Sequence, residues 1–115
     1  MNFENITFTV EAGIARLTLN RPDKLNSFNG AMHAELRAAL DSIQNDKSVR
    51  VLVLSGAGRA FCAGQDLADP AMAAVDGKMP DIGNVVEASY KPLILRLQNL
   101  RVPTIAAVNG IAAGA

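Results

Sequence analysis

Two short apolar segments on either side of a helical pattern constrain the fold of this chain more than any other feature. Residues 51–54 form a continuous apolar run with the length and β-branched content of a strand buried on both faces. Residues 104–108 are predicted to form a second buried strand, after a mobile loop over residues 68–84 and a helix over residues 85–100 that Pro92 should kink or interrupt. The order strand, helix, strand predicts a parallel pair with a right-handed crossover, and hence an α/β fold.

A hairpin and a further helix are predicted in front of these segments. Residues 6–10 alternate apolar with polar side chains, and residues 14–19 follow a short turn, so the two segments are expected to pair as antiparallel strands. Residues 32–43 repeat apolar side chains at spacings of four and three, which is typical of a helix with one apolar face. Ser27 or Asn29 is expected to cap this helix.

Composition limits the size and the partners of the protein. The chain has 115 residues, of which 50% are hydrophobic and 19% charged, so we expect one modest core and at most one domain. Eleven basic and 11 acidic residues balance, which argues against a nucleic-acid-binding protein. No apolar run approaches the ~18 residues that cross a bilayer, and the acidic N-terminus lacks a signal-peptide core. We therefore expect a cytoplasmic protein that does not enter a membrane.

The common catalytic and metal-binding motifs are missing from the sequence. With one cysteine, Cys62, and one histidine, His33, we expect neither a disulfide nor a metal site. Cys62 has no neighbouring base and is interpreted as a packed residue, and His33 is interpreted as a solvated or capping residue. The glycines after residues 51–54 lack the third glycine of a dinucleotide fingerprint, and Gly64 does not precede a Walker lysine.

Glycine-containing loops follow both strands of the predicted parallel pair, at the strand ends where ligands bind in α/β sheets. In residues 58–67, Gly64 would let a ligand approach the backbone closely, and the N–H groups after it could serve as anion donors. A plain tight turn explains this loop equally well. Residues 109–115 are nearly free of bulky side chains and are predicted to open a helix, whose first N–H groups attract negative charge. Two such donors could face one oxygen.

The C-terminal residues are unusual for the end of a domain. Residues 105–115 are small and apolar, whereas natural domains more often end in polar segments. We therefore expect residues 1–115 to be the N-terminal portion of a single domain that continues beyond Ala115.

Three motifs in order resemble the enoyl-CoA hydratase/isomerase (crotonase) superfamily along nearly the whole chain. They are Asn20-Arg-Pro with Leu25-Asn26, Ala60-Phe-Cys-Ala-Gly-Gln-Asp-Leu67, and Pro103-Thr-Ile-Ala-Ala-Val-Asn-Gly110. The resemblance implies a crotonase-like spiral of repeated ββα units, of which these residues would form the N-terminal part. It also implies a homotrimer or a hexamer.

The resemblance further implies a site made largely of backbone. In this family the thioester oxygen of an acyl-CoA lies between two backbone N–H groups, whose positions match Gln65 and Ala115. The residues that match the substrate-binding and CoA-binding positions are Lys24, Leu25, Ala63, Gly64, Gln65, Asp66, Leu67 and Gly114. The acid/base residues of the family lie beyond the position of Ala115. Coenzyme A is part of the substrate, so neither a separate cofactor nor a metal is implied.

The implied function is that of an acyl-CoA isomerase that stabilises an enolate. Residues 25–28, 32–33, 61–67 and 111–114 resemble the branch of the family that converts 1,2-epoxyphenylacetyl-CoA to oxepin-CoA in phenylacetate breakdown, and other isomerases of the family move a double bond. The alternatives are an enoyl-CoA hydratase, which adds water with two glutamates, and a non-catalytic crotonase-fold protein that binds CoA. A Clp-type serine peptidase would need a serine in residues 61–67, which contain none.

Overall fold

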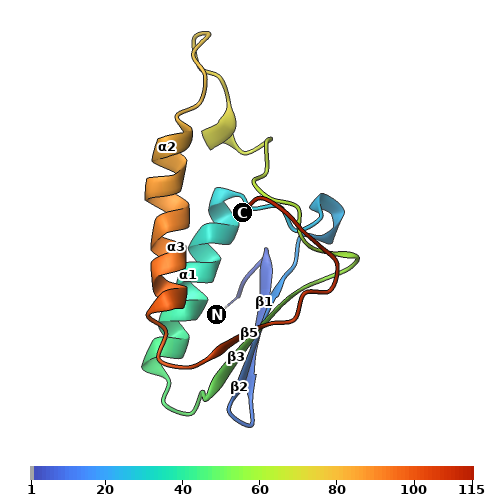
Figure 1. Ribbon diagram of the computed structural model, residues 1–115, viewed down its shortest axis with the longest axis vertical. Helices are drawn as coiled ribbons and strands as arrows, with labels where there is room; N and C mark the ends of the chain where they lie inside the picture. Colours follow the sequence, from blue (N-terminus) through green and yellow to red (C-terminus); the bar gives the residue numbers. More distant parts are fainter. Residues whose placement is uncertain (1) are drawn as a thin grey trace.

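The computed structural model describes residues 2–115 and has a four-stranded sheet with helices on one face (Figure 1). The strand order is β1 (Ile6–Glu11), β2 (Ile14–Leu19), β3 (Val51–Gly56) and β5 (Thr104–Ala106). Strands β1 and β2 are antiparallel, whereas β2, β3 and β5 run parallel to one another. The predicted α/β class and the predicted parallel pair are both confirmed.

The hairpin forms because its turn and its side-chain alternation agree. Ala12 and Gly13 both adopt positive φ, 52° and 81°, as the tight turns of hairpins require. In β2 the alternate residues Ala15, Leu17 and Leu19 are buried, which places the apolar face of the hairpin against the helices.

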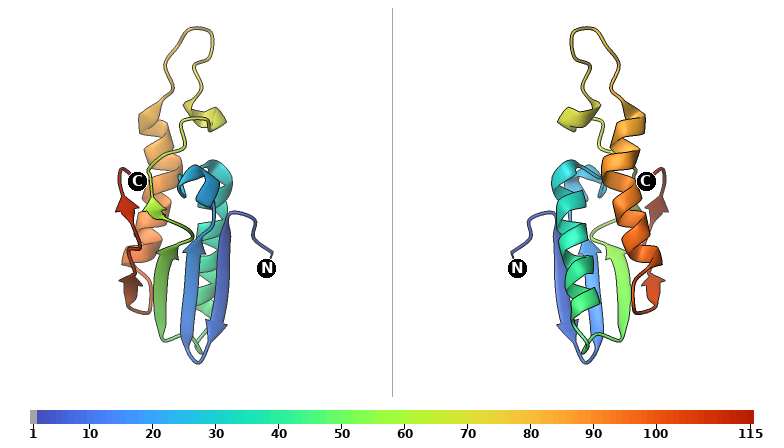
Figure 2. Two further views of the ribbon diagram at one scale, coloured as in Figure 1. Left: turned by 90° about the vertical axis from the view of Figure 1, so that its right-hand side faces the viewer. Right: turned by 90° about the vertical axis from the view of Figure 1, so that its left-hand side faces the viewer.

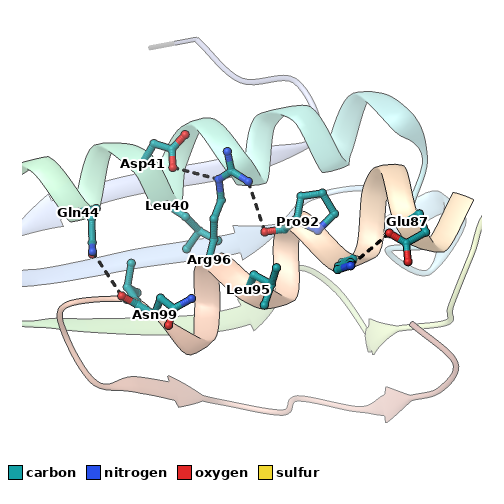
Figure 3. Close-up of a pocket in the computed structure, with 10 residues that line it drawn as sticks. Leu40, Asp41, Gln44, Glu87, Pro92, Leu95, Arg96 and Asn99 are labelled. Carbon is teal, nitrogen blue, oxygen red and sulfur yellow. Dashed lines mark hydrogen bonds and ion pairs between the residues drawn. The ribbon is translucent and has the colours of Figure 1, made fainter. Parts of the chain in front are cut away.

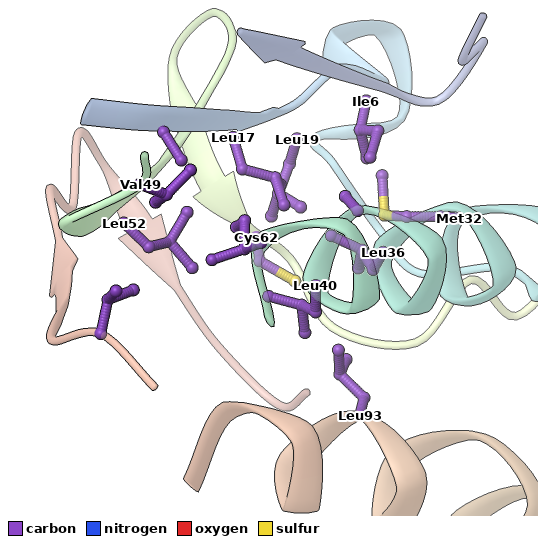
Figure 4. Packing of buried hydrophobic residues seen from close by; sticks show 14 of the residues in the cluster. Ile6, Leu17, Leu19, Met32, Leu36, Leu40, Val49, Leu52, Cys62 and Leu93 are labelled. Atoms are coloured by element: carbon purple, nitrogen blue, oxygen red, sulfur yellow. The ribbon is translucent and has the colours of Figure 1, made fainter. Parts of the chain in front are cut away.

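Helix α1 (Gly30–Asn45) covers one face of the sheet. Its N-cap is Asn29, whose side-chain oxygen accepts a hydrogen bond from the Met32 amide at 2.9 Å. The apolar stripe of α1 packs with β2, β3 and Leu93 in a single core, part of which Figure 4 shows. The predicted helix and one of its two predicted caps are thus confirmed.

The second helical region begins earlier than predicted and contains a π-helical segment. Helix α2 (Ile82–Val85) continues into the π-helical segment η3 (Val86–Tyr90) and then into α3 (Lys91–Gln98), next to α1 (Figures 1 and 2). Pro92 has no N–H and its ring crowds the preceding turn of an α-helix. Here the wider π turn precedes the proline, so Pro92 stands in the first turn of α3 and interrupts the α-helical hydrogen bonding.

Two predictions about the C-terminal segment were wrong. The strand expected at residues 104–108 is shorter and exposed, with Ile105 at 54% exposure, because β5 lies at the sheet edge and no described element covers it (Figure 2). The helix expected to open in residues 109–115 is also not observed. Instead β6 (Ile111–Ala112) pairs in parallel with β4 (Ala60–Cys62), so backbone pairing across sequence overrides the local helical preference of the alanines.

A long irregular segment joins β4 to α2. Residues 67–81 are mostly exposed, contain only the short 3-10 helix η2 (Pro70–Met72), and project beyond the sheet at one end of the molecule (Figure 1). In the described residues, no helix is long and apolar enough to cross a bilayer, and no three His, Cys, Asp or Glu side chains group as metal ligands.

Candidate functional site

The two glycine loops predicted to act together lie against each other. A Cβ placed on Gly64, whose φ is +112°, would lie 3.3 Å from the carbonyl oxygen of Ala113. A Cβ on Gly114, whose φ is +69°, would lie 3.1 Å from the Cα of Gly64. The Ala113 amide also donates to the carbonyl oxygen of Cys62 at 2.9 Å. The residues that follow these glycines, Gln65 and Ala115, are therefore carried by adjoining backbone segments.

The backbone around Gln65 forms a parallel bridge with Phe28. The Phe28 amide donates to the carbonyl oxygen of Gly64, and the Asp66 amide donates to that of Phe28, both at 2.8 Å. Residues of a strand direct their N–H groups to alternate sides, so the N–H of Gln65 points away from Phe28. Among residues 2–115 this N–H finds no hydrogen-bond acceptor, so it remains available to a ligand.

Two asparagines hold the loop that leads from β3 into β4. Asn26 is fully buried, and its side-chain amide donates to the carbonyl oxygens of Ala57 and Ala60 at 3.0 and 2.9 Å. Asn109 accepts from the Gly56 amide at 3.0 Å and donates to the carbonyl oxygens of Gly58 and Ala60 at 3.0 and 3.2 Å. Both belong to the motifs quoted above, but no local pattern indicates that their side chains converge on one loop.

An apolar cavity of about 130 Å³ lies between the sheet, α1 and α3. Its lining includes Phe28, Phe61, Tyr90, Leu93 and Ala115, so one of the two predicted donor residues borders it. The hydroxyl of Tyr90 donates a hydrogen bond to the side-chain oxygen of Gln65. Gln65 itself is half-buried. It does not line the cavity, but its side chain is hydrogen-bonded to Tyr90, which does.

His33 is neither solvated nor a cap, contrary to the prediction. It is 2% exposed, and its ring packs edge-to-face with Tyr90 at 4.4 Å and Phe28 at 5.1 Å between ring centroids. Neither ring nitrogen has a hydrogen-bond partner among the described residues. Burial, followed by the positive charge of Arg37, lowers the pKa of His33 from 6.5 to about 4, so the imidazole is neutral at pH 7. Its position on the apolar face of α1 decides its burial.

The predicted CoA-binding residues gather on one side of these loops. Leu25 has φ +53° and accepts a hydrogen bond from the Ala63 amide at 3.0 Å, while Lys24 and Leu67 are exposed. Lys24 and Asp66 line an open hollow of about 560 Å³. The structure thus brings Lys24, Leu25, Ala63 and Asp66 together, with Leu67 pointing to solvent at 77% exposure.

Asp66 and Cys62 have structural partners. Asp66 forms an ion pair with Arg21 at 2.9 Å, and the guanidinium of Arg21 also donates to the carbonyl oxygen of Ser27. A hydrogen bond from the Ala68 amide, followed by that from Arg21, lowers the pKa of Asp66. Cys62 is buried, which raises the pKa of its thiol, and its sulfur accepts from the Gly64 amide at 3.3 Å. The interpretation of Cys62 as a packed residue agrees with its burial.

A further groove of about 530 Å³ lies between α1 and α3, away from these loops (Figure 3). Arg96 pairs with Asp41 across it at 3.0 Å, and the Gln44 side chain donates to the carbonyl oxygen of Asn99 at 3.3 Å. None of the predicted site residues lines this groove, so it is separate from the candidate site.

Comparisons with known proteins agree with this architecture. The family described as enoyl-CoA hydratase/isomerase matches residues 9–115. The chain is 53% identical over 112 residues to the 1,2-epoxyphenylacetyl-CoA isomerase of Escherichia coli K12 and 40% identical over 115 residues to a probable enoyl-CoA hydratase of Rhodobacter capsulatus. These alignments cover 97% and 100% of this chain but 42% of each relative, so the chain spans less than half of their length.

Solved structures are similar over the same extent. The Pseudomonas aeruginosa protein PA4980 superposes with a TM-score of 0.81 at 40% identity, covering 96% of this chain and 46% of that one. An enoyl-CoA hydratase from Mycobacterium smegmatis superposes with a TM-score of 0.78 at 34% identity, covering 91% and 40%. The matched region contains all three motifs and both glycine loops. The chain therefore belongs to the enoyl-CoA hydratase/isomerase (crotonase) family.

Proposed function

We propose that the protein binds an acyl-CoA thioester and stabilises its enolate with the backbone N–H groups of Gln65 and Ala115. The observation that carries the proposal is the amide of Gln65, which has no acceptor among residues 2–115 and lies in a loop packed against the loop of Ala115. A donor fixed in advance at a developing oxyanion lowers the barrier, because it need not reorganise during the reaction.

The same proposal places the acyl group and the coenzyme A portion of the substrate. Gly64 and Gly114 allow the thioester to approach both backbones, and Ala115 borders the apolar cavity, where the acyl group would lie. Coenzyme A would run past Lys24, Leu25, Ala63, Asp66 and Leu67, with the ammonium of Lys24 close to its phosphates. The reaction would need no metal and no cofactor beyond the CoA of the substrate.

Proton transfer is assigned to a residue outside residues 1–115. The two carboxylates that follow Gln65 most closely are already engaged: Asp66 pairs with Arg21, and Asp69 accepts from the amides of Gly30 and Ala71 at 2.7 and 2.8 Å. A homotrimer or hexamer and a cytoplasmic location stay predictions.

Isomerisation is the favoured reaction, because the protein that is 53% identical to this chain is named a 1,2-epoxyphenylacetyl-CoA isomerase. The alternative is hydration, since the relative at 40% identity is a probable enoyl-CoA hydratase. Full-length protein should convert 1,2-epoxyphenylacetyl-CoA to oxepin-CoA. Chromatography and mass spectrometry of the products would measure this conversion. Water addition to a 2-enoyl-CoA without epoxide isomerisation would favour the hydratase. Binding of both thioesters with no product from either would indicate a non-catalytic CoA-binding protein.

Replacing Gly64 by valine should weaken acyl-CoA binding by about tenfold or more. A β-branched residue is strained at φ +112°, and its Cβ would lie 3.3 Å from the carbonyl oxygen of Ala113, so the loop must move from the position in which its backbone approaches the ligand. Calorimetric titration of the full-length variant with butyryl-CoA measures this. Gly77→Val is the matched control: Gly77 also has positive φ, +75°, but a Cβ there meets nothing within 4 Å. Equal affinities in the folded Gly64→Val variant and the wild type would contradict the site.

A further inference from the structure

Tyr90 occupies an unusual place in the helical region. It is the last residue of the π-helical segment η3, directly before Lys91 and Pro92. A π turn widens the helix and changes the direction in which its side chains leave the axis, and such turns recur at functional sites. Here the turn leaves the Tyr90 side chain half-buried and directed toward the loop of Gln65.

The contacts of Tyr90 join its helix to the Gln65 loop. Its hydroxyl donates to the side-chain oxygen of Gln65, and the nitrogen of that side chain donates weakly to the carbonyl oxygen of Asp66 at 3.4 Å. Its ring stacks on Phe28 at 6.0 Å and packs edge-to-face on His33 at 4.4 Å. Burial raises the pKa of Tyr90 to about 12, so the phenol remains a donor at neutral pH.

Phe28 and Tyr90 restrain Gln65 from two directions. The Phe28 amide holds the carbonyl oxygen of Gly64 and so orients the peptide that carries the Gln65 N–H. Tyr90, stacked on Phe28, holds the end of the Gln65 side chain. Gly64 adopts a backbone conformation that only glycine tolerates readily, so the peptide after it depends on such restraints. The Tyr90–Gln65 bond also links the loop that precedes the exposed segment of residues 67–81 to the helical region that follows it.

We propose that Tyr90 is a positioning residue, whose hydroxyl holds the Gln65 side chain and thereby keeps the Gln65 N–H aimed at the thioester oxygen. The inference rests on the proposed function. It assigns no chemical step to Tyr90: the phenol keeps its proton and acts on the reaction only through the orientation of Gln65.

The test compares three single variants of the full-length protein and the double variant Tyr90→Phe/Gln65→Met. Tyr90→Phe removes the hydroxyl and keeps the ring against His33 and Phe28, whereas Gln65→Met removes the acceptor at similar length. Gln44→Met is the matched control, because Gln44 also ties the end of α3 to α1 through side-chain hydrogen bonds, but far from the site. The probe is butyryl-CoA labelled with ¹³C at the thioester carbonyl, whose stretching frequency falls when the oxygen accepts hydrogen bonds.

We expect the wild type to lower the carbonyl frequency of bound butyryl-CoA, and we expect that lowering to be smaller in Tyr90→Phe and in Gln65→Met. Both variants should lower kcat by about three- to tenfold, the loss that one hydrogen bond supports, with CoA affinity unchanged within about twofold. The double variant should have a kcat no lower than that of the less active single variant, because the two substitutions remove the same hydrogen bond. Gln44→Met should lower the melting temperature and leave frequency and kcat unchanged.

A wild-type frequency and kcat in Tyr90→Phe would overturn the positioning role, as would multiplicative losses in the double variant. If Tyr90→Phe fails to fold, the frequency and kcat of Gln65→Met test the proposal, since this variant removes the acceptor of the same hydrogen bond. Wild-type protein that does not bind butyryl-CoA, or binds it without a frequency shift, would overturn the proposed function and this inference with it.

Discussion

Gln65→Pro is expected to lower kcat/KM for an acyl-CoA substrate by about a hundred- to a thousand-fold in the full-length protein, whereas Gln65→Ala should lose only the roughly three- to tenfold expected from the hydrogen bond with Tyr90. Proline has no N–H, so the first variant deletes the proposed oxyanion donor, and loss of one such donor typically costs ~2.7–4 kcal/mol. Alanine retains the N–H and loses only the side-chain hydrogen bonds with Tyr90 and with the carbonyl oxygen of Asp66. The contrast separates backbone from side-chain contributions at one position.

Steady-state kinetics on both variants, together with calorimetric titration with coenzyme A, would measure this contrast. The titration is needed because proline can also distort the loop through the bridge between Phe28 and Gln65. The comparison counts when CoA affinity is retained. Equal activities of Gln65→Pro and the wild type would rule out this N–H as an oxyanion donor.

Acidification from pH 7 to pH 4 is expected to remove about 3 kcal/mol of stability through His33 alone. The folded-state pKa of His33 is about 4, below its ordinary 6.5. The unfolded chain therefore takes up the proton first, so the stability is fully present above pH 6.5 and is lost as the pH falls toward 4. The groups that act on the ring are Arg37, which lowers the pKa, and Asp69, which raises it.

Urea denaturation of the full-length protein at a series of pH values would measure this loss, with His33→Phe as the comparison. The variant keeps an aromatic ring beside Phe28 and Tyr90 but has no group that titrates, so its stability should vary much less between pH 6.5 and 4. The lowered pKa of Asp66 acts in a different window, because its ordinary pKa is 3.8 and its contribution is lost only below that value. An unchanged pH dependence in His33→Phe would contradict the assignment.

Much of the fold could be predicted from sequence because it depends on local periodicity. The hairpin, the helix capped by Asn29 and the buried strand β3 each have a pattern within a few neighbouring residues, and the structure contains all three. The glycine loops were predicted because residues 58–67 and 109–115 follow the two strands of the predicted parallel pair, which the structure contains as β3 and β5. The family followed from the order and spacing of three motifs.

The tertiary structure alone decided which distant groups meet. Pairing of β4 with β6 replaced the helix expected after Asn109, because backbone hydrogen bonds between segments far apart in sequence outweigh a weak local preference. His33 became buried, and Tyr90 reached Gln65, because α1, the π turn before Pro92 and the sheet pack around one core. Sequence by itself determined the elements and the loops that carry the proposed donors. The Gln65 amide without an acceptor among residues 2–115 and the tyrosine beside it arise only from long-range packing, which no local pattern encodes.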